Sequence, residues 1–419
     1  MRIAYIFTTF PKLSEQFFLR EVVELQRQGL ALDIYSMIGG HKDSEAGPVC
    51  CMSWLDWLCF VLELLYWVIV GPVPMLRLIK QLLFTRYGSW TNRGENLLGF
   101  AFAVRFARRF KHLNYSCAHA TWATGPGMAG YALQALIDQP YTLEAHAYDV
   151  FRDGGDAFLK MKLEAAEALR SSTEATTRAL QARLAPSSET QVVCVRRGLA
   201  GIPLYRAPIT PEVALEILSV GRLIEKKGYL DQLEIYAELM ARGISFHASI
   251  VGEGPLRVDL NRKITELGLR GHVTLSGKLE YAQVEALYAQ ANLFLFTGVV
   301  STSGDRDGFP NVIGEAMAHS VPIFTTDVSG TTEGVPHGIR GTVIDLADPQ
   351  QTATQIFELM QDLAELQRLT RAAHDWVVSD FQVERNVRKL RAALWGASSE
   401  RVYPAILGSV SSDNICPGV

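Results

Sequence analysis

The sequence predicts an α/β protein made of two Rossmann-like domains, each with a doubly wound parallel sheet. Short, almost continuous apolar runs alternate with longer helical segments along most of the 419 residues. Apolar runs of this kind, bounded by Gly, Asp or Thr, are typical of parallel strands that are buried on both faces. Repeated strand–helix–strand units favour right-handed crossovers and helices on both sides of the sheet. The length is sufficient for two domains, each with its own core.

The predicted strands follow directly from these apolar runs. In the first half of the chain they cover residues 2–7, 31–37, 116–120, 141–145, 173–177 and 191–195. In the second half they cover residues 216–220, 246–251, 273–276, 293–297, 322–326 and 341–344. Helices such as 15–28 and 127–137 fit between them. Because ligands bind such sheets beyond the carboxyl ends of the strands, two sheets that face each other would place the site in one cleft.

A proline-rich segment divides the two predicted domains. Residues 199–211 carry Pro203, Pro208 and Pro211 and show little periodicity, which is typical of a linker. We therefore predict an N-terminal domain over residues 1–205 and a C-terminal domain over residues 206–382. A terminal helix is predicted over 383–397, and the tail over 398–419 is expected to be poorly ordered.

Composition excludes several functional classes. Hydrophobic residues make up 48% and charged residues 20%, and the net charge of −4 gives no general attraction to nucleic acid, so no nucleic-acid partner is expected. The six cysteines form no CxxC pair, which favours reduced thiols and no metal site. Residues 1–7 are typical of a strand rather than a signal peptide, so we expect a cytoplasmic protein.

Residues 46–111 interrupt the alternating pattern and are predicted to form a helical insertion. Residues 52–79 are mostly apolar and aromatic, but the longest uncharged run, 64–76, is shorter than the roughly 20 residues of a membrane-spanning helix. Basic residues are frequent from Arg77 to Lys111. Apolar and cationic residues side by side suit a helix on the inner, anionic face of a membrane, so residues 52–111 are a candidate membrane contact. The alternative is an insertion that packs on the first domain.

The segment over residues 221–228 is a candidate phosphate site. It joins a predicted strand to a helix that starts near Tyr229, and it contains Arg222 and Lys227. An arginine binds two oxygens at once and a lysine supplies a point charge, so two such cations beside a helix N-terminus are suited to a diphosphate. The alternative is a solvated basic turn.

A second loop and helix, over residues 304–318, carries two acidic residues. Pro310 is typical of the first turn of a helix, which places Asp307 in the preceding loop and Glu315 on the helix. Carboxylates suit sugar hydroxyls, and a buried Glu315 would need a ligand or a cation, such as an arginine, as its partner. The turn before the helix would direct its amide groups at an anion. That turn consists of Gly308, Phe309, Pro310 and Asn311.

Candidate residues of the first half also follow predicted strands. His146 and Asp149 lie at the carboxyl end of the strand 141–145. A lone histidine is often structural, but this position also suits a functional one. Ser14 is expected to cap the helix after the first strand, and Glu15 to lie in its first turn. The place of this loop at the predicted cleft makes both residues candidates for acceptor contact.

Together these segments resemble glycosyltransferase family 4, which has the GT-B architecture. The resemblance rests on the loop 221–228, the segment Val-Gly-Glu-Gly-Pro-Leu over 251–256, Gly277 at a strand end, and two acids separated by seven residues. Residues 10–15 and 145–149 resemble the bacterial exopolysaccharide branch, which includes colanic-acid-type enzymes. Two positions depart from the pattern, because Asp307 stands where Glu is usual and Thr121 stands where a second histidine is common.

The resemblance implies a role for each candidate residue. Arg222 and Lys227 would bind the donor diphosphate, and the acids would bind the donor sugar (Asp307) and the ribose (Glu315). His146 would lie near the anomeric centre and Asp149 on the acceptor side. The nucleobase would lie beside Gly277, Lys278 and Leu279, and the helix after Phe381 would cross back to the first domain.

The resemblance also implies a reaction. A sugar would be transferred with retention from a nucleotide-diphosphate sugar to a glycan or polyprenyl-linked acceptor in exopolysaccharide synthesis, with neither a metal nor another cofactor. Arg222, Lys227 and the helix dipole would stabilise the departing diphosphate. The alternatives are a nucleotide-sugar epimerase of the same architecture and a non-catalytic scaffold of a polysaccharide assembly complex.

Overall fold

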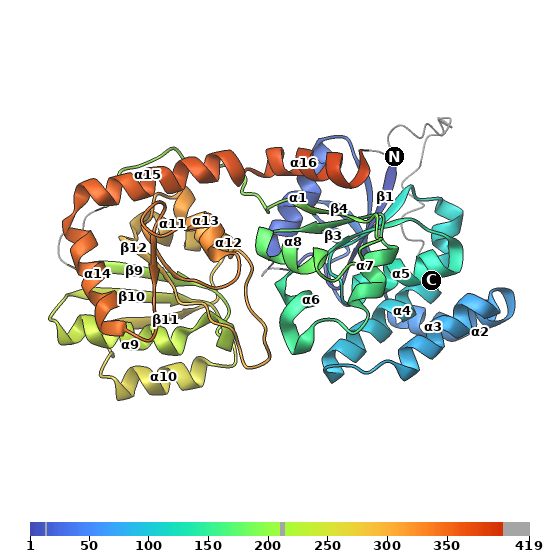
Figure 1. Cartoon of the computed structure of the whole chain (residues 1–419), viewed down its shortest axis with the longest axis horizontal. Coiled ribbons are helices and arrows are strands. Elements are labelled where there is room, and N and C mark those ends of the chain that lie inside the picture. The colour runs from blue at the N-terminus through green and yellow to red at the C-terminus, as the bar shows by residue number, and fades with distance from the viewer. Residues whose placement is uncertain (13–14, 210–213, 397–419) are drawn as a thin grey trace. The chain divides into compact units, whose positions relative to one another are not determined.

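The computed structural model describes residues 1–12, 15–209 and 214–396 and contains two compact units (Figure 1). The first unit comprises Met1–Gly198 together with the chain from Val383 onward, and the second comprises Leu199–Gln382. The chain therefore enters the second unit a few residues before the boundary predicted at 205/206. Ser14 and the predicted tail over 398–419 lie outside the described residues.

The first unit is built on an eight-stranded sheet in the order β3-β4-β2-β1-β5-β6-β7-β8. Its strands run parallel, apart from the pairing of β3 with β4. They are β1 (Arg2–Phe7), β2 (Ala31–Ser36), β3 (Asp43–Ser44), β4 (Gly47–Cys51), β5 (Cys117–Ala120), β6 (Tyr141–Glu144), β7 (Ala168–Ser171) and β8 (Gln191–Cys194). The strands over 43–44 and 47–51 were not among those that the sequence predicted.

The strand predicted over residues 173–177 is wrong, because a helix starts there. Thr173 is the N-cap of α8 (Glu174–Gln181), and its hydroxyl oxygen accepts a hydrogen bond from the amide of Thr176. Threonine suits both strands and helix N-caps, and here the capping preference prevails. The strand of this part of the sheet is β7, which lies a few residues earlier in the chain.

The predicted insertion over 46–111 is only partly an added layer. The strand β4 pairs with β2, and α4 (Trp90–Leu113) packs against α5 (Gly125–Ile137) in the core, where it buries Phe102 and Phe106. Outside α4 lie α2 (Trp54–Val70) and α3 (Pro72–Phe84), which pack against each other (Figure 1). None of the helices in the described part of the chain is long and apolar enough to cross a membrane.

The opposite face of this sheet is covered by α1 (Gln16–Arg27) and α16 (Val383–Trp395). Phe18 and Val22 of α1 share one buried cluster with Leu390 and Trp395 of α16. The side chain of Gln28 also donates a hydrogen bond to the carbonyl oxygen of Glu384 at 3.0 Å. The helix predicted after Phe381 thus returns to the first unit. Short helices complete this unit: α6 (Ala147–Phe151) and α7 (Leu159–Ala165).

The second unit has a six-stranded parallel sheet in the order β11-β10-β9-β12-β13-β14. The strands are β9 (Leu215–Val220), β10 (Phe246–Val251), β11 (Val273–Gly277), β12 (Leu293–Phe296), β13 (Ile323–Thr326) and β14 (Thr342–Ile344). Each lies within a residue or two of its predicted position, which is the usual uncertainty of strand ends.

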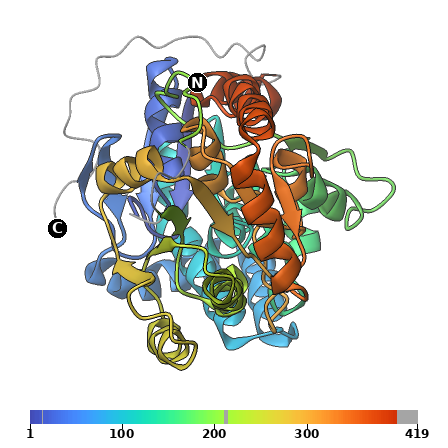
Figure 2. The ribbon, with the colours of Figure 1, turned by 90° about the vertical axis from the view of Figure 1, so that its left-hand side faces the viewer.

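Helices cover both faces of the second sheet (Figure 2). Two separate apolar clusters form the core. One face carries α9 (Tyr229–Ala241), α10 (Arg257–Glu266) and α14 (Pro349–Gln361). The other carries α11 (Tyr281–Gln290), α12 (Asn311–Ala318) and α15 (Leu363–Asp380), with the short α13 (Thr331–Gly334) near β13. The predicted doubly wound parallel sheet is therefore confirmed for this unit.

Candidate active site

The candidate donor site lies in two loops that follow the neighbouring strands β9 and β12. The hydroxyl of Thr297, after β12, donates to the carbonyl oxygen of Gly228 at 3.0 Å, and the amide of Val299 donates to the carbonyl oxygen of Lys226 at 3.0 Å. Gly228 has a φ of +64°, and a Cβ atom there would lie 1.8 Å from the carbonyl oxygen of Thr297. Glycine is therefore required where the two loops meet.

Ion pairs join the side chains of these two loops. The ammonium of Lys227 lies 2.6 Å from Oδ2 of Asp307, and the ammonium of Lys226 lies 3.0 Å from Asp305 and 3.4 Å from Asp307. Burial alone would raise the pKa of Asp307, but the two lysines outweigh it and hold the pKa below its usual value. Asp307 is therefore ionised at neutral pH and can accept hydrogen bonds from sugar hydroxyls.

Arg222 stands beside this ion cluster. A Cβ atom on Gly221 would lie 3.2 Å from Cε of Lys227, so the lysine side chain packs against the turn that carries Arg222. The Arg222 side chain is exposed, and among the described residues it has no carboxylate partner. An exposed guanidinium next to a partly buried ammonium is the arrangement that the diphosphate prediction requires.

The helix α12 begins at Asn311, and Pro310 is its N-cap residue. Pro310 therefore precedes the helix instead of lying in its first turn as predicted. The first amides of α12, at Asn311 and Val312, have no carbonyl of the same helix one turn earlier, so they are suited to an anion. Gly308 and Phe309 lie in the loop before the N-cap residue.

Glu315 lies one turn into α12 and is buried, with 9% of its surface exposed. The hydroxyl of Tyr288 donates a hydrogen bond to its carboxylate at 3.3 Å. Tyr288 is thus one partner of this buried carboxylate.

The predicted nucleobase side adjoins the same loops. Gly277 ends β11, and its carbonyl oxygen accepts a hydrogen bond from the amide of Gly252 at 2.8 Å. Gly252 in turn lies so close to Gly221 that a Cβ atom would stand 1.9 Å from the carbonyl oxygen of Gly221. These contacts bring Gly277, which begins the predicted nucleobase segment 277–279, next to the turn that carries Arg222. Both lie at the carboxyl ends of the strands.

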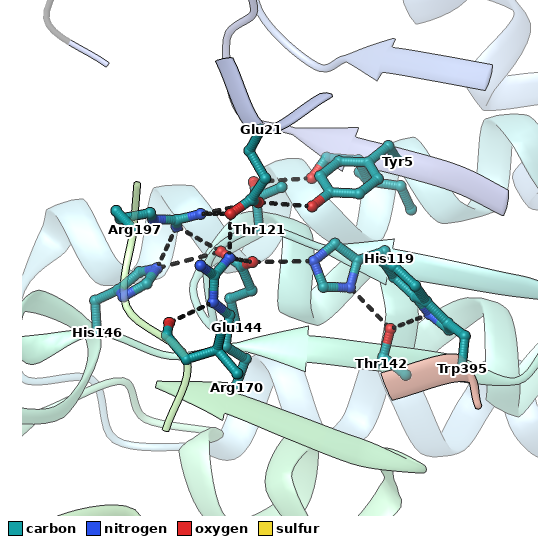
Figure 3. Close-up of polar contacts among 12 residues, drawn as sticks. Tyr5, Glu21, His119, Thr121, Thr142, Glu144, His146, Arg170, Arg197 and Trp395 are labelled. Carbon is teal, nitrogen blue, oxygen red and sulfur yellow. Dashed lines mark hydrogen bonds and ion pairs between the residues drawn. The ribbon is translucent and has the colours of Figure 1, made fainter. Parts of the chain in front are cut away.

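The first unit contains a buried network of charged side chains (Figure 3). Arg170 lies 2.6 Å from Glu21 and 2.5 Å from Glu144, and Arg197 lies 3.0 Å from Glu21 and 2.6 Å from Glu144. The hydroxyl of Tyr5 donates to Glu21 at 3.0 Å. Two cations and two anions compensate each other here, and the removal of one partner from such a set costs about 3–5 kcal/mol.

His146 lies at the edge of this network and is partly exposed. Its Nε2 atom is 3.0 Å from Nη2 of Arg197 and 3.4 Å from Oε2 of Glu144 (Figure 3). Its ring packs against Trp122. Burial is the largest cause that lowers the pKa of His146, Arg197 acts in the same direction, and Glu144 opposes both. The imidazole is therefore neutral at neutral pH.

Asp149, predicted on the acceptor side, is buried and supports the backbone. Its carboxylate oxygens accept hydrogen bonds from the amides of His146 at 2.8 Å and Thr124 at 3.2 Å. Burial raises the pKa of Asp149 to about 8. Asp149 therefore fixes the loop that carries His146, and its place on the acceptor side stays a prediction.

The remaining candidates of the first unit lie apart from this network. Glu15 is the N-cap residue of α1, not a first-turn residue as predicted, and its carboxylate pairs with Lys12 at 2.6 Å. His119 is completely buried, and the hydroxyl of Thr121 donates to the carbonyl oxygen of Ile6 at 3.0 Å.

Sequence analysis missed several of the charged residues that build these sites. Lys226 and Asp305 lie inside the two loops that it singled out, so their spacing to Lys227 and Asp307 was a usable signal. In the first unit it missed Glu21, Glu144, Arg170 and Arg197, which are distant in the chain. Glu144 at the end of a strand, next to His146, was the available signal there.

The family described as Glycosyl transferases group 1 matches residues 207–376. These residues are thus similar to a group 1 glycosyltransferase domain. The match includes the whole candidate donor site, from Gly221 to Glu315, and the group 1 domain therefore coincides with most of the second unit.

Curated relatives match over a similar length. One, in Salmonella typhimurium, is provisionally named the colanic acid biosynthesis glycosyltransferase WcaL and is 31% identical over 45% of this chain and 47% of its own. The amylovoran biosynthesis glycosyltransferase AmsK of Erwinia amylovora is 31% identical over 43% of this chain and 44% of its own. The chain thus matches somewhat less than half the length of these relatives.

Solved structures resemble the whole chain in fold. A glycosyltransferase from Rickettsia africae has a TM-score of 0.68 at 15% identity and covers 94% of this chain and 98% of its own. Alr3699/HepE of Anabaena, in complex with UDP and glucose, has a TM-score of 0.68 at 15% identity and covers 96% of this chain and 100% of its own. The fold is thus the GT-B architecture that the sequence predicts.

Proposed function

We propose that this chain is a retaining glycosyltransferase that moves a sugar from a nucleotide-diphosphate sugar to a glycan or lipid-linked acceptor in the synthesis of a bacterial cell-surface polysaccharide. The observation that carries this proposal is the arrangement of Arg222, Lys227 and Asp307 at the carboxyl ends of neighbouring parallel strands in a group 1 domain. Two cations are available for a diphosphate, and an ionised acid stands beside them for the attached sugar.

The comparisons support transfer rather than epimerisation. The relatives WcaL and AmsK carry names of glycosyltransferases that act in polysaccharide synthesis. A protein of the same fold has been solved with UDP and glucose, which supports a nucleotide sugar as the donor class. Asp307 is shorter than the glutamate that is usual at this position, but its carboxylate still reaches Lys227. This ion pair argues against a non-catalytic scaffold.

Bond cleavage in this proposal depends on the stabilisation of the leaving group. Arg222, Lys227 and the first amides of α12 would stabilise the negative charge that develops on the departing diphosphate. The acceptor oxygen would bond to the anomeric carbon from the face that the phosphate leaves, and the acceptor proton would pass to the phosphate oxygen. Asp307 would hold hydroxyls of the sugar, Glu315 those of the ribose, and His146 would position the reacting groups. No metal ion takes part in this scheme.

We also propose that α2 and α3 form the part of the insertion that contacts a membrane surface rich in anionic lipids. Their outer side chains are apolar and strongly exposed, as shown by Ile69 at 77% and Phe84 at 79%. A contiguous exposed surface of many apolar side chains is unusual on a protein that stays in water. It is formed by Trp54, Trp57, Leu58, Val61, Leu62, Leu65, Ile69, Val70, Val73, Leu76, Leu83 and Phe84.

Charge supports the choice of an anionic membrane as the partner. Arg77 and Lys80 of α3, with Arg86 just after it, are exposed near the apolar side chains. Two arginines of α4 have a different role, since Arg105 pairs with Asp56 at 2.9 Å and Arg108 with Glu63 at 3.3 Å. These pairs neutralise the acids of α2, so the cations of α3 are left to face lipid headgroups.

The substitution Lys227→Ala is expected to lower the turnover of a nucleotide-sugar donor by at least about 100-fold, because it removes a stabiliser of the leaving group. The measurement is the initial rate of nucleoside diphosphate release, with Lys263→Ala on the surface helix α10 as the matched control. Thermal unfolding of both variants checks the fold. Near-normal turnover in folded Lys227→Ala would show that Lys227 does not stabilise the departing diphosphate.

Chelation of divalent cations is expected to leave the reaction rate unchanged, because the proposed site uses fixed cations in place of a metal. The test compares donor turnover before and after treatment with EDTA, followed by removal of the chelator. A complete loss of rate that magnesium restores would show that the scheme is wrong in this respect.

The double substitution Leu62→Glu and Ile69→Glu is expected to weaken binding to anionic phospholipid vesicles by at least about tenfold, since burial of one such side chain is worth about 1.5–3 kcal/mol. Co-sedimentation with vesicles measures the binding. The matched control is Val258→Glu with Ile339→Glu, which places the same charges at exposed apolar positions of the second unit. Equal binding of both double variants would contradict the membrane proposal.

A further inference from the structure

Two lysines that are adjacent in the chain, Lys226 and Lys227, both contact the carboxylate of Asp307. The ammonium of Lys227 lies 2.6 Å from Oδ2, and that of Lys226 lies 3.4 Å from Oδ1. Each carboxylate oxygen therefore has its own cation. Lys226 also lies 3.0 Å from Oδ2 of Asp305, so two cations compensate two acids in this cluster.

The two lysines differ in their surroundings. The Cε atom of Lys227 packs against the turn that carries Arg222. The ammonium of Lys226 instead contacts both Asp305 and Asp307, and only 8% of its side chain is exposed. Lys227 is thus the lysine that is placed to reach a diphosphate beside Arg222, and Lys226 is the one that stays with the acids.

Further contacts fix Lys226 relative to the loop that carries the two acids. Its carbonyl oxygen accepts a hydrogen bond from the amide of Val299 at 3.0 Å. The carboxylate of the preceding residue, Glu225, accepts hydrogen bonds from the amide of Thr302 at 2.8 Å and from its hydroxyl at 3.0 Å. The turn with Lys226 and the loop with the acids are therefore joined by backbone and side-chain contacts as well as by ion pairs.

A diphosphate at Lys227 would change the electrostatic balance around Asp307. Burial raises the pKa of Asp307, and Lys227 opposes burial more strongly than Lys226 does. A bound diphosphate would share the charge of Lys227 and add negative charge nearby, and both changes favour the protonated acid. Protonation would take away part of the capacity of Asp307 to accept hydrogen bonds from sugar hydroxyls. Lys226 is the cation that remains at the other carboxylate oxygen.

We propose that Lys226 is a positioning residue that keeps Asp307 ionised and in place while Lys227 engages the donor diphosphate. Asp305 shares the ammonium of Lys226 and holds it within the loop. Lys226 makes no contact with the donor in this arrangement and acts through Asp307. The inference rests on the proposed function, which supplies the diphosphate and the sugar hydroxyls.

Other charged and titratable groups near Asp307 have different roles. Tyr229 of α9 is buried, and its pKa is raised by burial and, to a smaller extent, by Asp307, so its hydroxyl is neutral. Asp305 adds negative charge and cannot stabilise a second carboxylate. Arg306 donates through Nε to a carbonyl oxygen of its own loop at 3.2 Å, and Arg222 is assigned to the diphosphate.

The uptake of protons on binding of inorganic pyrophosphate tests the proposal in the full-length chain without a known donor sugar. Calorimetric titrations at about pH 6, in buffers with different ionisation enthalpies, give the number of protons taken up per bound pyrophosphate. We expect Lys226→Met to take up at least about 0.3 proton more than wild type, because Asp307 then becomes protonated when the anion binds. Lys226→Arg keeps the positive charge and should match wild type, as should the matched control Lys263→Met on α10.

The combination of Lys226→Met with Asp307→Asn identifies the group that takes up the proton, and the extra uptake should be absent in it. Equal uptake by wild type and folded Lys226→Met would overturn the proposal, and so would extra uptake that persists in the double variant.

If Lys226→Met does not fold, the comparison of wild type with Asp307→Asn decides. Equal uptake is expected, since Asp307 of wild type stays ionised. Greater uptake by wild type would show that Lys226 does not keep Asp307 ionised. A wild-type chain that binds no pyrophosphate would instead contradict the diphosphate site of the proposed function, and this inference with it.

Discussion

The ion pair between Lys227 and Asp307 connects two loops that are distant in the sequence, and the candidate donor site depends on it. The pair can form because β9 and β12 are parallel neighbours, whose carboxyl ends meet at one edge of the sheet. Lys226 contacts the same aspartate, so Asp307 would keep a counter-ion when a diphosphate engages Lys227. A carboxylate can thus stand beside a binding site for an anion without a large cost from like-charge repulsion.

The first unit also compensates buried carboxylates with cations, but for a different purpose. Its buried glutamates and arginines are compensated within one network, which is costly to break but does not in itself bind a ligand. What this network supplies is orientation, since Arg197 and Glu144 determine how His146 is held, and Asp149 fixes the backbone from which His146 projects. The partly exposed His146 connects the network to the surface of its unit.

Periodicity was sufficient to predict most strands, the doubly wound sheets and the loops that carry Arg222, Lys227, Asp307 and His146. It failed where one residue type is common in two kinds of structure. Thr173 suits a strand, but here it is the N-cap of a helix. It also failed where partners are distant in sequence, because neither the contact of Arg197 with His146 nor the burial of Asp149 leaves a local pattern. The apolar residues of α2 and the basic residues of α4 were interpreted as parts of one insertion, although α4 belongs to the core.

The central claim is that the fixed cations of the second unit bind a diphosphate, and calorimetric titration of the full-length chain tests it most directly. If Lys227 and Arg222 bind both phosphates, a nucleoside diphosphate should bind at least about tenfold more tightly than the corresponding monophosphate, which is about 1.4 kcal/mol. That difference should largely disappear in Arg222→Ala. Equal affinities for the two nucleotides across a panel of nucleobases, or binding of neither, would contradict the account.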